Sequence, residues 1–254
     1  MLEKKKIVVT RPLGQEKSFI KLLQNAGAIV FHCPTIKISP CYNPKEFLSI
    51  LSEKRYDWVC FTSANGVNLA LDFAEKEEKM DFFRAAQIAC IGPATQETLK
   101  ARGVESSLIP EQFQAEGLIS TLQKENLKGK SFLLLRAKGA RKILREALAA
   151  EGASVLEFPL YDTFPDPQGL QTLKALLKTN SADVITFTSS STVRSFKQLI
   201  LEERVEVLPE TLIFASIGPI TSNTLLEEGL WVNVEAKTST TKGLVESLEE
   251  FFNP

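Results

Sequence analysis

Two hydroxyl-rich segments follow apolar runs at matching places in the two halves of the chain. The segment TSAN at 62–65 follows Trp58–Phe61, and TSSS at 188–191 follows Val184–Phe187. At the start of a helix, free backbone N–H groups and the helix dipole attract carboxylates and phosphates, and hydroxyl groups add further donors. These residues therefore indicate a site for a small polar or anionic molecule.

Two other kinds of polar segment also occur twice. Ile91-Gly92-Pro93 with Thr95 is matched by Ile217-Gly218-Pro219 with Thr221, and an arginine follows the first apolar run of each half, Arg11 and Arg136. Each serine or threonine taken alone could simply cap a helix. Because the same chemistry recurs in matched loops, a binding role for the loops together is the better hypothesis.

An internal duplication explains the matches. Four residue pairs lie 125 positions apart: Arg11 and Arg136, Gly14 and Gly139, Gly27 and Gly152, Pro34 and Pro159. The motif Phe-Thr-Ser at 61–63 recurs at 187–189, and the offset of 126 also relates Gly103 to Gly229 and Gly117-Leu118 to Gly243-Leu244. Offsets shared by so many blocks indicate two copies of one structural unit.

The elements that must position these loops follow from hydrophobic periodicity. Short apolar runs predict buried strands, and the pattern at 15–25, ended by Gly27, predicts a helix. Pro93 and Pro219 fit the first turn of helices that end at Gly103 and Gly229. The strands are expected at 7–10, 29–33, 58–61, 87–91, 184–187 and 212–217. Alternating strands and helices predict α/β units with parallel sheets, which bind ligands beyond the carboxyl ends of the strands.

Composition narrows the function classes. The chain has 254 residues and a net charge of −1, so no general basic field for nucleic acid exists. No stretch predicts a signal peptide or a membrane span, so we expect a cytoplasmic protein. We expect neither a cofactor nor a metal site, because the glycine fingerprint of dinucleotide sites is missing and His32 is the single histidine. Free thiols are expected at Cys33, Cys41, Cys60 and Cys90.

Tyr161 is a separate candidate for chemistry. It follows Phe158-Pro159-Leu160, whereas Ile36 stands at the equivalent place of the first repeat, so the tyrosine is not a product of the duplication. A tyrosine at a ligand site can donate a proton or a hydrogen bond. An aromatic residue that merely packs between domains is the alternative.

In these residues the chain resembles the uroporphyrinogen-III synthase family over essentially its whole length. The segments that carry the resemblance are Val9-Thr10-Arg11-Pro12, Phe61-Thr62-Ser63, Phe158–Thr163, Phe187-Thr188-Ser189 and Ile217-Gly218-Pro219 with Thr221, continuing through Gly229 to Gly243-Leu244. Their order and spacing are more specific than any one of them. Ser190-Ser191-Thr192 and Asn65 depart from the residues common in the family.

The resemblance implies a reaction. The family closes the linear tetrapyrrole hydroxymethylbilane into uroporphyrinogen III, with inversion of the last ring and loss of water. It needs no cofactor, and the many substrate carboxylates agree with helix starts rich in N–H groups. Catalysis by positioning a reactive substrate suits a site without strong acids or bases.

The resemblance also implies a crossed domain arrangement and a set of site residues. One domain would comprise 1–36 and 165–254, the other 40–160, with linker strands at 37–39 and 161–164 and a cleft between the domains. Two proline-rich segments, 37–44 and 163–169, favour this division. Tyr161 would assist departure of hydroxide. The residues expected to bind substrate are Arg11, Thr62, Ser63, Asn65, Thr95, Ser189, Ser191 and Thr221.

Partners and alternatives complete the expectations. The family implies a monomer that binds no nucleic acid or membrane and that could receive hydroxymethylbilane by transient hand-over from hydroxymethylbilane synthase. A binding module of two α/β lobes that holds an anion without turnover is a different class. A regulatory descendant is a third, which the lack of an appended DNA-binding or response domain disfavours.

Overall fold

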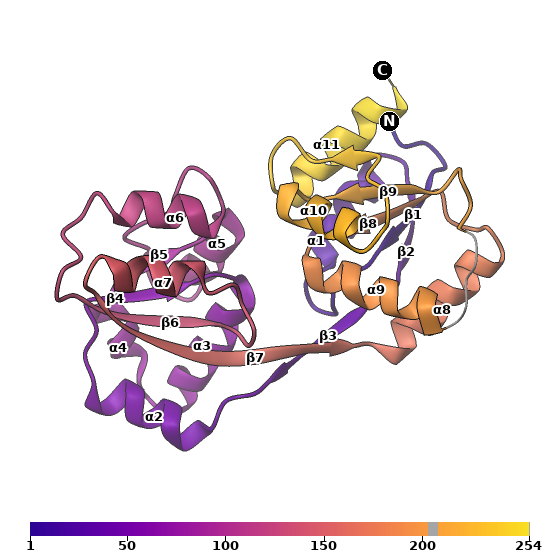
Figure 1. Ribbon diagram of the computed structural model, residues 1–254. Coiled ribbons are helices and arrows are strands. Elements are labelled where there is room, and N and C mark those ends of the chain that lie inside the picture. The colour runs from indigo at the N-terminus through magenta and orange to yellow at the C-terminus, as the bar shows by residue number, and fades with distance from the viewer. Residues whose placement is uncertain (203–207, 254) are drawn as a thin grey trace. The chain divides into compact units, whose positions relative to one another are not determined.

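The chain divides into two compact units in the computed structural model, which describes residues 1–202 and 208–253. Unit 1 comprises Met1–Ile38 and Thr163–Pro254, and unit 2 comprises Ser39–Asp162 (Figure 1). The chain passes from one unit to the other within strand β3 (Ile36–Pro40) and returns within strand β7 (Ser154–Pro165).

Unit 1 is built on a parallel sheet with the strand order β10-β9-β8-β1-β2. Its strands are β1 (Lys6–Val9), β2 (Ile29–His32), β8 (Val184–Phe187), β9 (Ile213–Ser216) and β10 (Val234–Glu235). Side chains alternate between the two faces of a strand. Ile7 and Val9 therefore pack under α1 (Lys17–Asn25) and α11 (Thr241–Phe252), and Val8 packs on the opposite face. That face is covered by α8 (Pro167–Lys178), α9 (Ser190–Glu202) and α10 (Pro219–Glu227).

Unit 2 contains a second sheet, with the order β3-β7-β6-β4-β5. Strands β4 (Trp58–Phe61), β5 (Gln87–Cys90), β6 (Ser131–Ala137) and β7 pair in parallel. Helices α6 (Ala115–Leu122) and α7 (Ile143–Ala150) bury one face over Leu134 and Cys60. The unit also has α2 (Pro44–Glu53), α3 (Ala64–Lys76), α4 (Met80–Ala85) and α5 (Pro93–Ala101), and the ring of Phe47 in α2 stacks on Phe158 of β7 at 5.1 Å between centroids.

The two sheets have matching plans, and each combines parts of both repeats. Strands β9-β8-β1-β2 of unit 1 correspond in order to β5-β4-β6-β7 of unit 2. Even the short β10 has its counterpart, a single bridge between Leu108 and Ala89 beside β5. Unit 1 joins the start of the first repeat to the end of the second, and unit 2 joins the two remaining parts.

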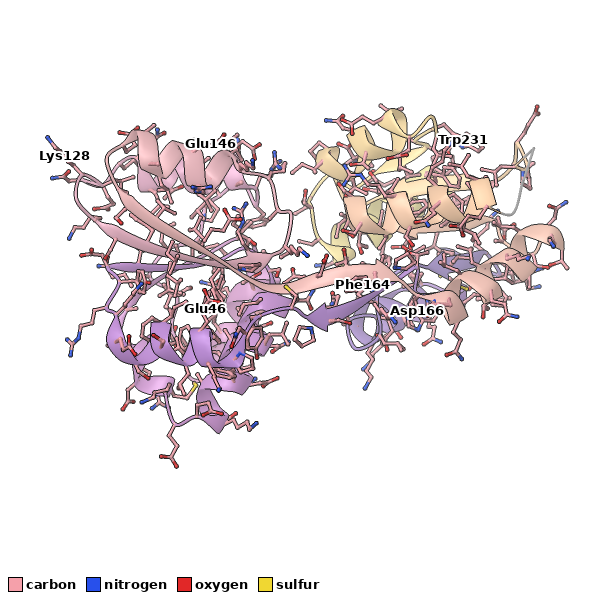
Figure 2. All side chains as sticks on the ribbon, turned by 60° about the horizontal axis from the view of Figure 1, so that its bottom comes forward. Glu46, Lys128, Glu146, Phe164, Asp166 and Trp231 are labelled. Atoms are coloured by element: carbon pink, nitrogen blue, oxygen red, sulfur yellow. The ribbon has the colours of Figure 1, made fainter. Side chains whose placement is uncertain are left out.

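Most expected elements are present, but the proline-rich segments are more ordered than linkers. Segment 37–44 contains the end of β3 and the first residue of α2, and segment 163–169 contains the end of β7 and the first turn of α8. Asn43 caps α2 by accepting from Lys45 N at 2.9 Å, and Asp166 caps α8 by accepting from Gln168 N at 3.1 Å (Figure 2 labels Asp166). Asn-Pro and Asp-Pro therefore mark helix starts, because a cap residue precedes a proline that occupies the first helical position.

Candidate functional site

Tyr161 and Ser63 meet at the carboxyl end of the unit 2 sheet. The Tyr161 hydroxyl lies 2.8 Å from Ser63 Oγ, within hydrogen-bond distance. Ser63 follows β4, whereas Tyr161 lies in β7, so the parallel order β4-β6-β7 brings the two residues to one edge. Asn65 also hydrogen-bonds the phenol. The structure thus brings together three of the residues that the sequence predicts for the site.

The environment of the phenol keeps it protonated. Tyr161 is only 6% exposed, and this burial raises the pKa of its hydroxyl, while the hydrogen bonds from Ser63 and Asn65 offset part of the rise. Burial disfavours the charged phenolate, whereas donors that point at the oxygen favour it. Tyr161 is therefore a neutral hydroxyl that can donate a proton or a hydrogen bond at physiological pH.

Ser63 and Ser189 are helix caps as well as candidate ligand groups. Ser63 Oγ accepts from Gly66 N at 3.2 Å at the start of α3, and Ser189 Oγ accepts from Thr192 N at 3.3 Å at the start of α9. Both side chains are partly exposed, as are their neighbours Thr62 and Ser191. Capping fixes the direction of each hydroxyl and does not by itself exclude a ligand.

Thr95 and Thr221 differ from the other predicted hydroxyls. Both are 4% exposed and occupy the third position of α5 and of α10. The cap residues are Gly92 and Gly218, so neither helix start is covered by a capping side chain. The structure leaves the threonine hydroxyls inside the fold and the backbone N–H groups of the first turn as the polar groups of these loops.

Arg11 and Arg136 both turn back onto their own loops. Arg11 Nε donates to the Gln15 carbonyl at 2.9 Å, and Arg136 Nη2 donates to the Ala140 carbonyl, also at 2.9 Å. The acceptor stands four residues beyond the arginine in each case. A guanidinium can bind several acceptors at once. The predicted contact between Arg11 and a ligand would therefore use the N–H groups that do not bond to Gln15.

His32 and Glu16 support the Arg11 loop in unit 1. His32 Nε2 lies 2.8 Å from the Arg11 carbonyl oxygen, which can only accept, so the ring carries its proton on Nε2. Burial alone would raise the pKa of Glu16, but backbone N–H groups at residues 14–16 and the nearby His32 outweigh it and lower the pKa. Sequence reasoning did not find Glu16, because an acidic residue before a helix has no distinctive spacing.

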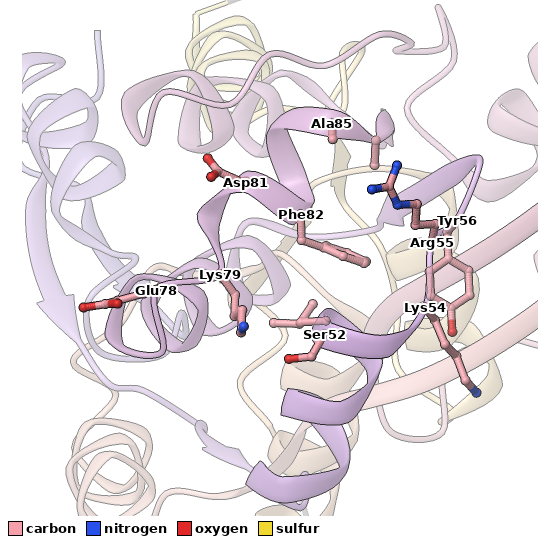
Figure 3. Close-up of a pocket in the computed structure, with 11 residues that line it drawn as sticks. Ser52, Lys54, Arg55, Tyr56, Glu78, Lys79, Asp81, Phe82 and Ala85 are labelled. Atoms are coloured by element: carbon pink, nitrogen blue, oxygen red, sulfur yellow. The ribbon is translucent and has the colours of Figure 1, made fainter.

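Cavities lie both near to and far from these residues. In unit 1, Ser191 lines a cavity of about 230 Å³ together with Ile36, Phe164 and Arg194. A larger cavity of unit 2, about 480 Å³, is lined by Tyr56 and Phe82, among others (Figure 3). It contains none of the predicted site residues, and its lining comes from segments before β4 and β5, at the amino ends of the strands.

Fold and site together define a class of protein: a duplicated α/β chain whose two parallel sheets carry hydroxyl-rich helix starts at their carboxyl edges. A model of one family, described as uroporphyrinogen-III synthase HemD, matches residues 17–246. The chain belongs to the uroporphyrinogen-III synthase family, and it is an enzyme of tetrapyrrole biosynthesis.

The similarity to individual members of the family extends over almost the whole chain. The chain is 32% identical to the uroporphyrinogen-III synthase of Synechococcus elongatus, over 97% of this chain and 95% of the relative. It is 30% identical to a putative uroporphyrinogen-III synthase of Methanothermobacter thermautotrophicus, over 95% and 96%. Crystal structures of uroporphyrinogen-III synthase from Thermus thermophilus (a mutant; TM-score 0.69, covering 98% of each chain) and Helicobacter pylori (TM-score 0.65, covering 97% and 99%) share the fold at 18% identity. In the described part of the chain, no helix has the length and apolar character needed to cross a membrane.

Proposed function

We propose that this enzyme closes hydroxymethylbilane into uroporphyrinogen III, with inversion of the last pyrrole ring and loss of water, which makes it a lyase. Full-length similarity to uroporphyrinogen-III synthases supports the substrate. The contact between the Tyr161 hydroxyl and Ser63 Oγ, at 2.8 Å, is the observation that supports the chemistry.

Tyr161 would act where the substrate loses hydroxide. Departure of hydroxide is easier when a donor supplies a proton or a hydrogen bond to the leaving oxygen. A phenol whose pKa is raised by burial stays protonated and can serve as that donor. Ser63 and Asn65 would orient the hydroxyl and, by donating hydrogen bonds, stabilise the phenolate that forms when the proton leaves.

Recognition of the substrate carboxylates would come from the loops at the strand ends. Helices α5 and α10 start at glycine caps and can offer N–H groups, with partial positive charge, to carboxylates. Thr62, Ser189 and Ser191 are partly exposed and can add hydroxyl donors. Arg11 remains a proposed contact through the donors that Gln15 leaves unused, and Thr95 would act through its backbone N–H. Thr221 N already donates to the Gly218 carbonyl at 3.0 Å, so Thr221 would bind a carboxylate by sharing that N–H.

Once the substrate is bound, the main contribution to catalysis would be to hold it in a reactive conformation. Hydroxymethylbilane ionises readily, so the enzyme mainly has to hold the chain in the conformation in which the last ring attacks in the inverted sense. We further propose that the protein acts in the cytoplasm as a monomer without a cofactor. Hydroxymethylbilane synthase would supply the substrate by transient hand-over.

A coupled assay tests the function. Hydroxymethylbilane is generated by its own synthase in the presence of this protein, and the oxidised uroporphyrin isomers are separated by chromatography. Dominance of isomer III would support the proposal. Dominance of isomer I, the product of spontaneous closure, would refute catalysis and favour a protein that binds anions without turnover.

A further inference from the structure

Arg136 is a charged residue whose side chain is buried inside unit 2. It is 2% exposed and is the largest fully buried side chain among the described residues. A buried guanidinium is costly unless hydrogen bonds satisfy it. Nη2 donates to the carbonyl oxygens of Ala140 at 2.9 Å and Arg141 at 2.6 Å. Within the part of the chain that the structure describes, Nε has no hydrogen-bond partner, but it lies 3.5 Å from Glu157 Oε1, whose charge offsets part of the cost.

The loop that Arg136 holds is attached directly to the backbone of Tyr161. Lys138 N, two residues after Arg136, donates to the Tyr161 carbonyl at 2.7 Å. Arg136 fixes the far side of the same loop through the carbonyls at 140 and 141. The loop therefore has two anchors, the buried guanidinium at one end and the main chain of the candidate catalytic residue at the other.

A β-bulge at this point sets the direction of Tyr161. Arg136 pairs with Pro159, but the next residue, Ala137, pairs with Tyr161, so Leu160 is an additional residue in β7. Bulges change the direction of the side chain that follows and are common next to active sites. Leu160 is fully buried and Tyr161 still reaches Ser63. The irregularity thus lies directly between Arg136 and the phenol.

We propose that Arg136 is a positioning residue: by clamping the loop 137–141 beside the bulge, it holds Tyr161 in the direction that lets its hydroxyl meet Ser63. The proposal rests on the proposed function of Tyr161. Arg136 then makes no contact with substrate carboxylates, because its side chain is enclosed, Nη2 is directed at main-chain carbonyls and Nε lies beside Glu157.

The other repeat supports the assignment of the clamp. Arg11 makes the equivalent contact to Gln15, but Ile36 stands at the position of Tyr161. The arginine clamp is therefore a common property of both repeats, and in unit 2 a catalytic side chain is attached to it. Arg136 differs from Arg11 in being fully buried and in lying beside Glu157.

Arg136→Lys and Arg136→Met separate positioning from substrate binding. Both variants should lower kcat by about tenfold or more while KM stays within about twofold, because orientation is lost and no substrate contact is removed. Arg102→Gln, which breaks an exposed ion pair with Asp72 in the same unit, is the matched control and should keep both parameters. A rise in KM at constant kcat would overturn the positioning role.

Two readouts do not depend on turnover. The Lys138 amide should exchange with solvent about tenfold faster in the Arg136 variants, because the loop opens more easily. The ¹³C resonance of the Tyr161 ring, assigned with Tyr161→Phe, should shift in the same variants. If both stay as in the parent protein, the proposal is wrong even when activity falls; if the parent protein makes no isomer III, only the proposed function fails.

Glu157→Gln covers the case in which the Arg136 variants do not fold. It keeps the guanidinium and removes the negative charge beside Nε. We expect faster exchange at Lys138 and a Tyr161 shift in the same direction, both smaller than for Arg136→Met. No change in either the Lys138 exchange rate or the Tyr161 resonance would contradict the positioning role of Arg136.

Discussion

Ser63 Oγ lies 2.8 Å from the hydroxyl of Tyr161, across 98 positions of sequence. The same oxygen accepts from Gly66 N at the start of α3. One hydroxyl therefore joins a helix start to a phenol, so the position of α3 and the direction of Tyr161 depend on each other. Neither residue could keep its present place if the order of β4, β6 and β7 changed.

Tyr161→Phe should lower turnover about a hundredfold or more, because general acid catalysis contributes on that scale. The ring and its burial are kept, so the free energy of unfolding should fall by only about 1 kcal/mol relative to the parent protein. Initial rates of isomer III formation and urea denaturation measure the two effects. Tyr42→Phe, in an aromatic cluster with Phe47 and Phe73, is the control. Full activity of Tyr161→Phe would remove it from the mechanism.

Ser63→Ala and Ser189→Ala form a matched pair. Each removes a helix cap and should lower the free energy of unfolding by about 1 kcal/mol. Only Ser63→Ala should also raise the pKa of Tyr161, since the Ser63 hydrogen bond stabilises the phenolate and lowers that pKa. Ultraviolet titration of tyrosine, with Tyr161→Phe as reference, measures the shift. An unchanged or lower pKa in Ser63→Ala would show that the contact is weak in solution.

The sequence predicts the sheets well because their strands are short runs of apolar residues buried on both sides. All four residues of β4 and of β8 are buried, as the runs at 58–61 and 184–187 imply. The repeat offset is equally reliable, because it compares residues without assuming any geometry. Helices α2 and α8 are harder to detect, since prolines near a helix start look like those of a linker until the cap residue before them is considered.

The directions in which side chains point could not be predicted from the sequence. Thr95 and Thr221 stand at the expected helix starts, but their burial depends on how the helix packs against its sheet. The arginine clamp is hidden for a similar reason: no spacing shows that Arg136 turns back to the Ala140 carbonyl of its own loop, or that the neighbouring β7 has a bulge there. Periodicity predicts which residues lie on an element, whereas packing between distant segments decides what they contact.

Asp57 should make unit 2 sensitive to acid. Hydrogen bonds from Ser131 N and Oγ, with help from Lys130, lower the pKa of Asp57 to about 2. A depressed folded-state pKa contributes stability above the unfolded-state value, and this stability is lost as the pH falls from about 4 through 2. Asp57→Asn should lower the free energy of unfolding at pH 7 by about 1 kcal/mol, allowing for the screening of a partly exposed group.

The pH profile distinguishes this effect from a general loss of packing. The difference between parent and Asp57→Asn should shrink as the pH approaches 2, because the parent carboxyl is then protonated. Asp81→Asn, which loses an exposed pair with Arg84, is the control. A difference that stays constant from pH 7 to pH 2 would contradict the titration of Asp57.

Gly243→Ala should destabilise unit 1 through a main-chain contact. A Cβ on Gly243 would lie 2.3 Å from the Thr238 carbonyl oxygen, and the repeat equivalent Gly117 has the same relation to Gln112 at 2.2 Å. Relief of such overlap costs about 1–3 kcal/mol and should lower Tm by about 4–10 °C. In Gly229→Ala the added Cβ meets no atom of the described residues within 4 Å but stands at a φ of +71°, so this variant should lose only about 1 kcal/mol, from backbone strain without overlap. Equal melting temperatures for the two variants would contradict the overlap.

The exchange of segments between the repeats also sets an order of assembly during synthesis. Unit 2 is one continuous stretch, Ser39–Asp162, and β4 to β7 can pair as soon as that stretch has left the ribosome. β1 must wait for β8, about 175 residues later, and α1 must wait for α11 at the end of the chain. Until then the apolar side chains of β1 and β2 have no complete sheet to join, so residues 1–35 stay exposed until the second segment of unit 1 has been made.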